Sequence, residues 1–214
     1  MFNFYEVSDS QFGESLPQQI YRHILKKIIG KELNAGDKIV EEEIAKELNT
    51  SRAPVREALY LLQVEGIVER LPRRGTIVKP FTQAEIEDYN TLMAELLRVA
   101  VMYGQQKWTP EYKEMLKQYA ADADAACEQG NVREYGMKAE RVLRHVVLVA
   151  GNVALSKFYE KASLILNIFV EVKWSEQKIK EFHAPFKRFA ASILASEYEQ
   201  AQTSIYEFLQ AGIK

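Results

Sequence analysis

The sequence predicts a mainly α-helical protein: three helices with a β-hairpin in residues 1–80, then an all-α bundle of about six helices in 81–214. Two observations support this fold class. Up to Pro80, three short segments of helical periodicity precede two β-branched runs, whereas every segment after Thr82 has helical periodicity. The 214 residues are 47% apolar and 27% charged, a composition typical of a globular protein with a sizeable core.

The first two helices of the N-terminal part are short. Ser15 is a suitable N-cap, and Pro17 is tolerated in the first turn of the helix that follows. The apolar residues that recur on one face of this helix before Gly30 are Ile20, Ile24 and Ile28. Residues 34–37 form a turn cluster, and residues 41–48 predict a second helix whose acidic start suits the helix dipole.

A three-residue break at 49–51 leads to the third helix. So short a break favours a tight corner between two helices, with Ser51 as the N-cap of the second one. We expect this helix to reach about Glu65, where Gly66 marks its end. Its apolar stripe consists of Val55, Leu59 and Leu62. The neighbouring stripe consists of Arg52, Arg56, Tyr60 and Gln63.

A hairpin completes the N-terminal part. The runs 67–70 and 76–79 are rich in β-branched residues, and residues 71–75 between them include Pro, Gly and two arginines. A helix–corner–helix unit followed by a basic hairpin predicts a winged helix–turn–helix. In such a unit the second helix enters the DNA major groove, where arginine can contact guanine and phosphate contacts set the register.

The charge distribution agrees with a local nucleic-acid surface. The formal net charge of the chain is −2, but residues 49–79 carry six basic and three acidic residues. The acidic residues at 41–43 and 47 offset this charge just before the third helix. A near-neutral total therefore does not exclude binding to a polyanion.

The same segments resemble the GntR family of bacterial transcription regulators. The resemblance rests on residues 33–39, 43–48, 51–59, 65–66 and 73–76. It implies a homodimer that binds double-stranded DNA at a palindromic operator. It further implies that the DNA contacts are made by Ser51, Arg52, Ala53, Arg56, Arg73, Arg74 and Gly75.

The C-terminal part begins at a predicted capping box, Thr82 to Glu85, and its helix breaks fall near 108–110, 129–131, 151–152, 173–175 and 195–196. It resembles the subfamily of the fatty-acid-responsive regulator, whose helical bundle senses a ligand. Many members hold a divalent metal there, and the matching positions in this chain are Ala139, Leu143, Phe186 and Phe208. The position of an anion-holding arginine in many members is Met93. We therefore expect no bound metal.

These replacements predict an apolar effector pocket formed by Met93, Ala139, Leu143, His183, Phe186 and Phe208. An apolar or amphipathic effector would suit such a pocket, although the same side chains could instead fill it completely. His183 is expected at the pocket mouth, His145 at the surface or an interface, and His23 in solvent. Four further polar residues could face the interior but are more typical of a helix surface: Glu95, Arg98, Asn167 and Glu171.

The remaining expectations are exclusions. We find no phosphate loop, nucleophile elbow or Ser–His–acid arrangement, so we expect neither an enzyme nor a cofactor. Cys127 is the only cysteine and follows two alanines, as a packing residue would. The start of the chain lacks the features of a signal peptide, and no apolar run is long enough to cross a bilayer, so a cytoplasmic location without membrane contact is expected. The sequence thus predicts a ligand-responsive DNA-binding regulator; the alternative is a helical ligand-binding or protein-interaction module that does not bind specific DNA.

Overall fold

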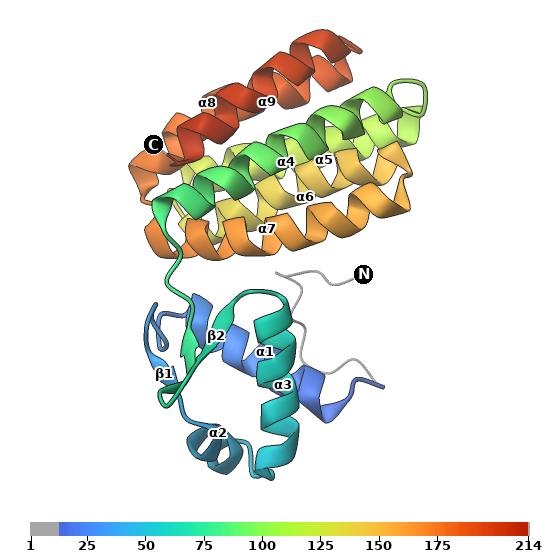
Figure 1. The fold of residues 1–214 in the computed structure, drawn as a ribbon. Coiled ribbons are helices and arrows are strands. Elements are labelled where there is room, and N and C mark those ends of the chain that lie inside the picture. The colour runs from blue at the N-terminus through green and yellow to red at the C-terminus, as the bar shows by residue number, and fades with distance from the viewer. Residues whose placement is uncertain (1–12, 214) are drawn as a thin grey trace. The chain divides into compact units, whose positions relative to one another are not determined.

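The computed structural model describes residues 13–213 and divides the chain into two compact units, Met1–Thr82 and Gln83–Lys214 (Figure 1). The division falls two residues after the boundary expected at Pro80. The structure confirms the predicted mainly helical fold class, with a small sheet confined to the first unit.

Unit 1 contains the three predicted helices and the predicted hairpin. Its elements are α1 (Leu16–Ile29), β1 (Lys38–Ile39), α2 (Glu41–Glu47), α3 (Arg52–Val64), β2 (Val68–Leu71) and β3 (Gly75–Val78). Ser15 caps α1 as expected, since its backbone N–H donates to Gln18 Oε1 at 3.1 Å. The corner between α2 and α3 contains Asn49 with a positive φ of 48°, a conformation that asparagine tolerates better than most residues.

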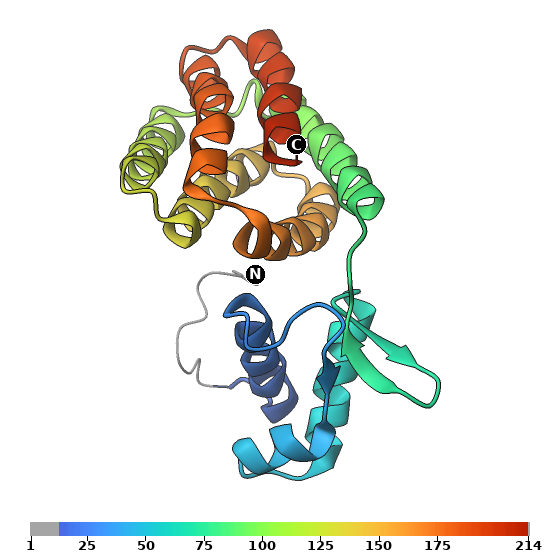
Figure 2. The same ribbon diagram turned by 90° about the vertical axis from the view of Figure 1, so that its left-hand side faces the viewer.

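The sheet has three antiparallel strands in the order β1-β3-β2 (Figure 2). The hairpin register pairs Val68 with Val78, and β1 pairs Lys38 with Ile77. The sequence did not predict β1, because a strand of two residues is too short to show an alternating pattern. The buried core of unit 1 includes Ile20, Ile24, Val55, Leu59, Leu62 and Ile67.

Unit 2 is the predicted bundle of six helices. They are α4 (Gln83–Gly104), α5 (Pro110–Glu128), α6 (Val132–Ala150), α7 (Val153–Lys173), α8 (Glu176–Leu194) and α9 (Tyr198–Ile213). The helices α5, α6, α7 and α8 each follow a capping residue whose side-chain oxygen accepts a hydrogen bond from the backbone N–H three residues later. These residues are Thr109, Asn131, Asn152 and Ser175. These caps explain why the sequence breaks marked the helix ends so closely.

An aromatic cluster forms one side of the unit 2 core. Phe182, Phe186, Phe189 and Phe208 lie with neighbouring ring centroids 5.2–6.5 Å apart. Most of these pairs are tilted or edge-to-face, arrangements that add to the stability gained from burying the rings. Cys127 is buried in the same core, as predicted for a packing residue.

The expectation for His145 was wrong. Its side chain is 3% exposed, and Nε2 lies 2.8 Å from the backbone carbonyl oxygen of Tyr112. The rings of Trp108, Tyr112 and Tyr119 meet it edge-on at 5.5–5.6 Å. The aromatic residues that bury it come from α5 and the loop before it, so the position of His145 on its own helix could not show its burial.

Candidate functional site

The first candidate surface is the exposed face of α3. Val55 and Leu59 fix the orientation of this helix, because they are buried against α1 and α2. The opposite face then leaves Ser51 exposed at the N-cap, with the side chains of Arg52 and Arg56 55% and 61% exposed. These are the residues at the N-terminal end of the helix, the end that reads base edges in helix–turn–helix proteins.

A single carboxylate holds both arginines in place. Arg56 Nε donates to Glu41 Oε2 at 2.7 Å, and a terminal guanidinium nitrogen of Arg52 lies 3.5 Å from the same oxygen. Glu41 is the first residue of α2, so this contact also ties the two helices of the motif together. An exposed ion pair of this kind contributes at most about 1 kcal/mol, so a phosphate or a guanine can replace the carboxylate.

Sequence reasoning missed this role of Glu41. It treated the three glutamates at 41–43 only as charges that suit the helix dipole and offset the basic segment that follows. The available signal was the combination of a glutamate at the start of α2 with two arginines in the first turns of α3.

The second part of this surface is the loop between β2 and β3, which projects from the sheet (Figure 2). Arg73 and Arg74 are exposed, and no residue between 13 and 213 forms an ion pair with either of them. Arg73 and Gly75 have positive φ values of 64° and 87°, so the loop needs a residue at 75 that accepts this conformation. Arg73 and Arg74 thus lie in the loop of the predicted wing, and Gly75 is the first residue of β3.

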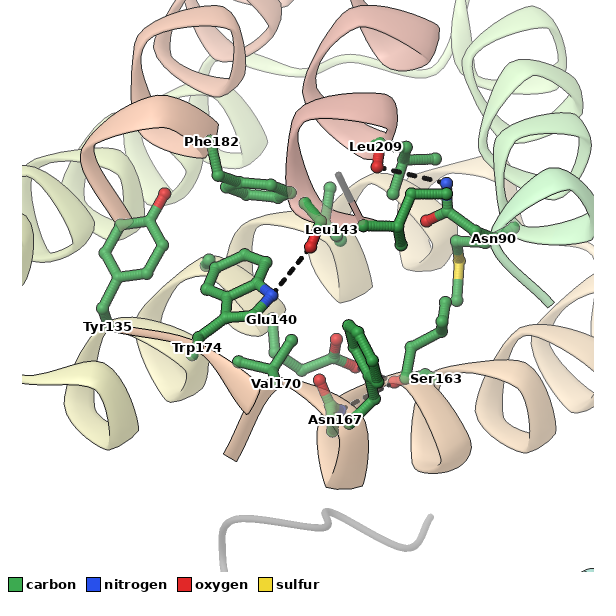
Figure 3. A pocket seen from close by; sticks show the side chains of 17 residues that line it. Asn90, Tyr135, Glu140, Leu143, Ser163, Asn167, Val170, Trp174, Phe182 and Leu209 are labelled. Atoms are coloured by element: carbon green, nitrogen blue, oxygen red, sulfur yellow. Dashed lines mark hydrogen bonds between the residues drawn. The ribbon is translucent and has the colours of Figure 1, made fainter. Parts of the chain in front are cut away.

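The second candidate site is a cavity of about 70 Å³ inside unit 2 (Figure 3). Its walls come from five helices of the bundle and from Trp174. The apolar part of the lining consists of Met93, Ala139, Leu143, Leu166, Phe169, Val170, Phe182, Leu209 and Ile213, with Tyr135 and Trp174.

The cavity includes only half of the residues predicted for it. Met93, Ala139 and Leu143 line it, but Phe186 and Phe208 lie in the aromatic cluster and are 1% and 0% exposed. His183 is not among the lining residues. The Nδ1 atom of His183 shares a hydrogen bond with the Tyr135 hydroxyl at 3.1 Å. Its Nε2 atom lies 3.1 Å from Asp124 Oδ1.

The physical reason for the misplacement of His183 is its position on α8. The adjacent residue, Phe182, turns toward the cavity, so His183 faces α5, where Asp124 is located. Burial lowers the pKa of His183, and the carboxylate of Asp124 partly offsets this effect.

One wall of the cavity is polar, which the sequence analysis did not predict. Glu140 is 6% exposed, and its Oε1 accepts hydrogen bonds from Arg144 at 2.9 Å and from the Ser163 hydroxyl at 2.7 Å. Burial raises the pKa of Glu140. Asn167 Nδ2 donates to Ser163 Oγ at 3.0 Å, which extends the polar wall along α7 (Figure 3).

A fourth polar side chain, Asn90, reaches the cavity from α4, and its Nδ2 donates to the carbonyl oxygen of Leu209 at 3.1 Å. Asn90 and Glu140 were not considered in the sequence analysis, whereas Asn167 was named as a residue that could face the interior. The other candidates differ: Glu95 and Arg98 pair with each other at 2.9 Å on the exposed side of α4. The cavity is therefore less apolar than the predicted pocket, because Asn90, Glu140 and Ser163 line it together with Asn167.

A divalent metal of the kind that the subfamily resemblance implies does not fit these residues. Ala139 and Leu143 line the cavity without any donor atom, and Phe186 and Phe208 are packed in the core. Over the described part of the chain, no three His, Cys, Asp or Glu side chains come together as metal ligands would. The described helices include none that is both long and apolar enough to cross a membrane.

Comparison with known proteins agrees with the geometry of unit 1. Residues 16–78 match the family of bacterial regulatory proteins described as the gntR family. The N-terminal unit is a GntR-type winged helix–turn–helix. In this GntR-type unit, the matched residues run from the start of α1 to the end of β3.

Curated relatives carry matching names. An uncharacterized HTH-type transcriptional regulator of Mycobacterium tuberculosis is 32% identical over 100 residues, which cover 47% of this chain and 41% of that protein. The HTH-type transcriptional repressor RspR of Escherichia coli is 34% identical over 82 residues, which cover 37% of this chain and 36% of the repressor. The matches thus span about two fifths of the length of these relatives. Their names describe regulators and not enzymes.

Solved structures match over nearly the whole chain. E. coli McbR/YncC has a TM-score of 0.76 at 18% identity, with 92% of this chain and 94% of that chain covered. A putative GntR transcriptional regulator from Rhodococcus sp. RHA1 has a TM-score of 0.76 at 16% identity, with 94% and 96% covered. At these identities the similarity shows a shared fold: a winged helix–turn–helix followed by a helical C-terminal domain.

Proposed function

We propose that this protein is a GntR-family transcriptional regulator that binds double-stranded DNA. The observation that carries the proposal is the pair of exposed arginines, Arg52 and Arg56, in the first turns of α3, with the basic loop of Arg73 and Arg74 in the same unit. An arginine at the start of a recognition helix can make a bidentate contact to guanine, and arginines in a wing can contact phosphates. Ser51, Ala53 and Gly75 complete the proposed contact surface.

We further propose a cytoplasmic homodimer that binds a palindromic operator. A two-fold symmetric dimer places two recognition helices in major grooves about one turn of DNA apart. In this proposal residues 81–214 form the dimerisation and effector-binding domain, similar to the fatty-acid-responsive subfamily. An effector in the cavity would change the separation of the two recognition helices and with it the operator affinity.

The effector in this proposal is a small amphipathic molecule. The lining supports this choice, because Met93, Leu143 and Leu166 offer apolar contact and Glu140 offers a polar one. Burial of apolar ligand surface contributes roughly 25 cal/mol per Å². A second possibility is that the cavity is only a packing defect, and the protein then senses nothing there.

The experiment that tests DNA binding is selection of duplexes from a random pool, followed by affinity measurements over a range of salt concentrations. We expect enrichment of a palindromic sequence and a steep linear fall of log affinity with log salt, since bound phosphates release counterions. No enrichment, together with a shallow salt dependence, would favour the other class of function: a helical ligand-binding or protein-interaction module.

A further inference from the structure

Three polar side chains line the unit 2 cavity beside Glu140: Asn90, Ser163 and Asn167. Asn90 Nδ2 is bonded to Leu209, and Asn167 Nδ2 to Ser163, so the amide orientations are fixed by their partners. The indole N–H of Trp174 already donates to the carbonyl oxygen of Gly212 at 2.9 Å. The acceptor groups of the lining are the Glu140 carboxylate and the amide oxygens of Asn90 and Asn167.

The carboxylate of Glu140 is one of these acceptors. Its hydrogen bonds from Arg144 and Ser163 both fall on Oε1, and Glu140 is among the residues that line the cavity. Asn90 and Asn167 are 7% and 8% exposed, so all three side chains are more than nine-tenths buried. A buried carboxylate is costly, and a ligand that donates a hydrogen bond to it regains part of that cost.

The charges around Glu140 do not balance. Arg144 forms ion pairs with both Glu140 and Glu160, so one guanidinium serves two carboxylates. When all three groups are ionised, the cluster has a net negative charge in a largely buried site. Burial raises the pKa of Glu140, which agrees with the cost of that charge. A cationic ligand would restore neutrality, whereas an anionic ligand would add to the imbalance.

We propose that this cavity binds a short amphipathic amine in its ammonium form, with the ammonium group at Glu140 and the apolar chain against Met93 and Leu143. The inference rests on the effector site of the proposed function and specifies its ligand class. The aromatic rings of Tyr135, Trp174 and Phe182 also line the cavity and can attract a cation. The volume is about half of the roughly 150 Å³ cavity that holds benzene, so the ligand must be smaller than benzene.

The test compares n-butylammonium, n-butanol and n-butyrate as probes at constant ionic strength. Apparent dissociation constants are obtained from the concentration dependence of the melting temperature of the full chain. We expect a saturable stabilisation by butylammonium, weaker stabilisation by butanol and none by butyrate. Equal or stronger binding of butyrate, or no binding of any probe, would overturn the proposal.

Variants locate the binding group. Glu140→Gln should weaken butylammonium binding by about tenfold or more, because it removes a charged partner in a buried site. Glu95→Gln is the matched control, since it removes an ion-paired carboxylate on the exposed side of α4, outside both the Arg144 network and the cavity lining. If Glu140→Gln does not fold, Asn167→Leu removes a neighbouring acceptor, and undiminished butylammonium binding by that variant would refute the site.

The same preparations are titrated with the selected DNA duplex, which separates the two proposals. A protein that binds DNA specifically but does not bind butylammonium refutes the ligand class alone. A protein that binds butylammonium but no specific DNA refutes the proposed regulator and leaves the ligand site intact.

Discussion

Substitution of Arg56 by alanine is the sharpest test of the α3 surface. The side chain is 61% exposed, and its ion pair with Glu41 contributes at most about 1 kcal/mol to the free protein. A bidentate contact between arginine and guanine contributes about 1–3 kcal/mol of discrimination. We therefore expect Arg56→Ala to weaken binding to the selected duplex by about 5- to 150-fold, while the free energy of unfolding changes little.

The assay is fluorescence anisotropy with the selected duplex and a scrambled duplex of equal length. Arg188→Ala is a matched control, because Arg188 is 56% exposed and forms a 2.6 Å ion pair with Glu207, but it belongs to the helical bundle. The reasoning is refuted if Arg56→Ala binds the selected duplex like the wild type. It is also refuted if the variant loses the same factor on both duplexes, since a base contact must act on sequence preference.

Three further predictions concern the wing, the ion pairs between Glu41 of α2 and the arginines of α3, and the bundle. Arg74→Ala should weaken binding to all duplexes and lower the salt slope by about one unit, as expected for a lost phosphate contact and measurable by anisotropy at several salt concentrations. Glu41→Gln should raise affinity for scrambled DNA relative to the selected duplex, because both arginines lose their carboxylate partner and become free to contact phosphates; an unchanged ratio would show that Glu41 does not influence selectivity. Purified protein should contain no stoichiometric zinc, nickel or manganese, and a chelator should leave its melting temperature unchanged; elemental analysis that finds about one metal ion per chain would contradict this.

Local patterns predicted the elements of the fold well. At five helix starts a residue with a capping side chain precedes an amphipathic segment, so the sequence contains two signals for the same boundary. These residues are Ser15, Thr109, Asn131, Asn152 and Ser175. The two-residue strand β1 has no such local signal, because it exists only through its pairing with β3.

The surface of α3 and the wing was predicted better than the cavity, because it depends on local sequence and the cavity does not. The exposed arginines of α3 follow from one helix and its apolar stripe, and the wing follows from one loop. The cavity depends on how five helices pack, and its polar wall joins Glu140 on α6 to Ser163 and Asn167 on α7. Spacing along α8 alone could not show that Phe182, and not His183, turns toward that space.

The burial of His145 makes the bundle sensitive to acid. Because its Nε2 must donate to the carbonyl oxygen of Tyr112, the neutral ring carries its proton on that nitrogen. Burial lowers its pKa in the folded protein, so the unfolded chain binds the proton more tightly. This contribution to stability is complete above the unfolded pKa of about 6.5 and declines as the pH falls below it. The contact between α5 and α6, where three aromatic rings enclose this imidazole, therefore contributes less stability in acid than at neutral pH.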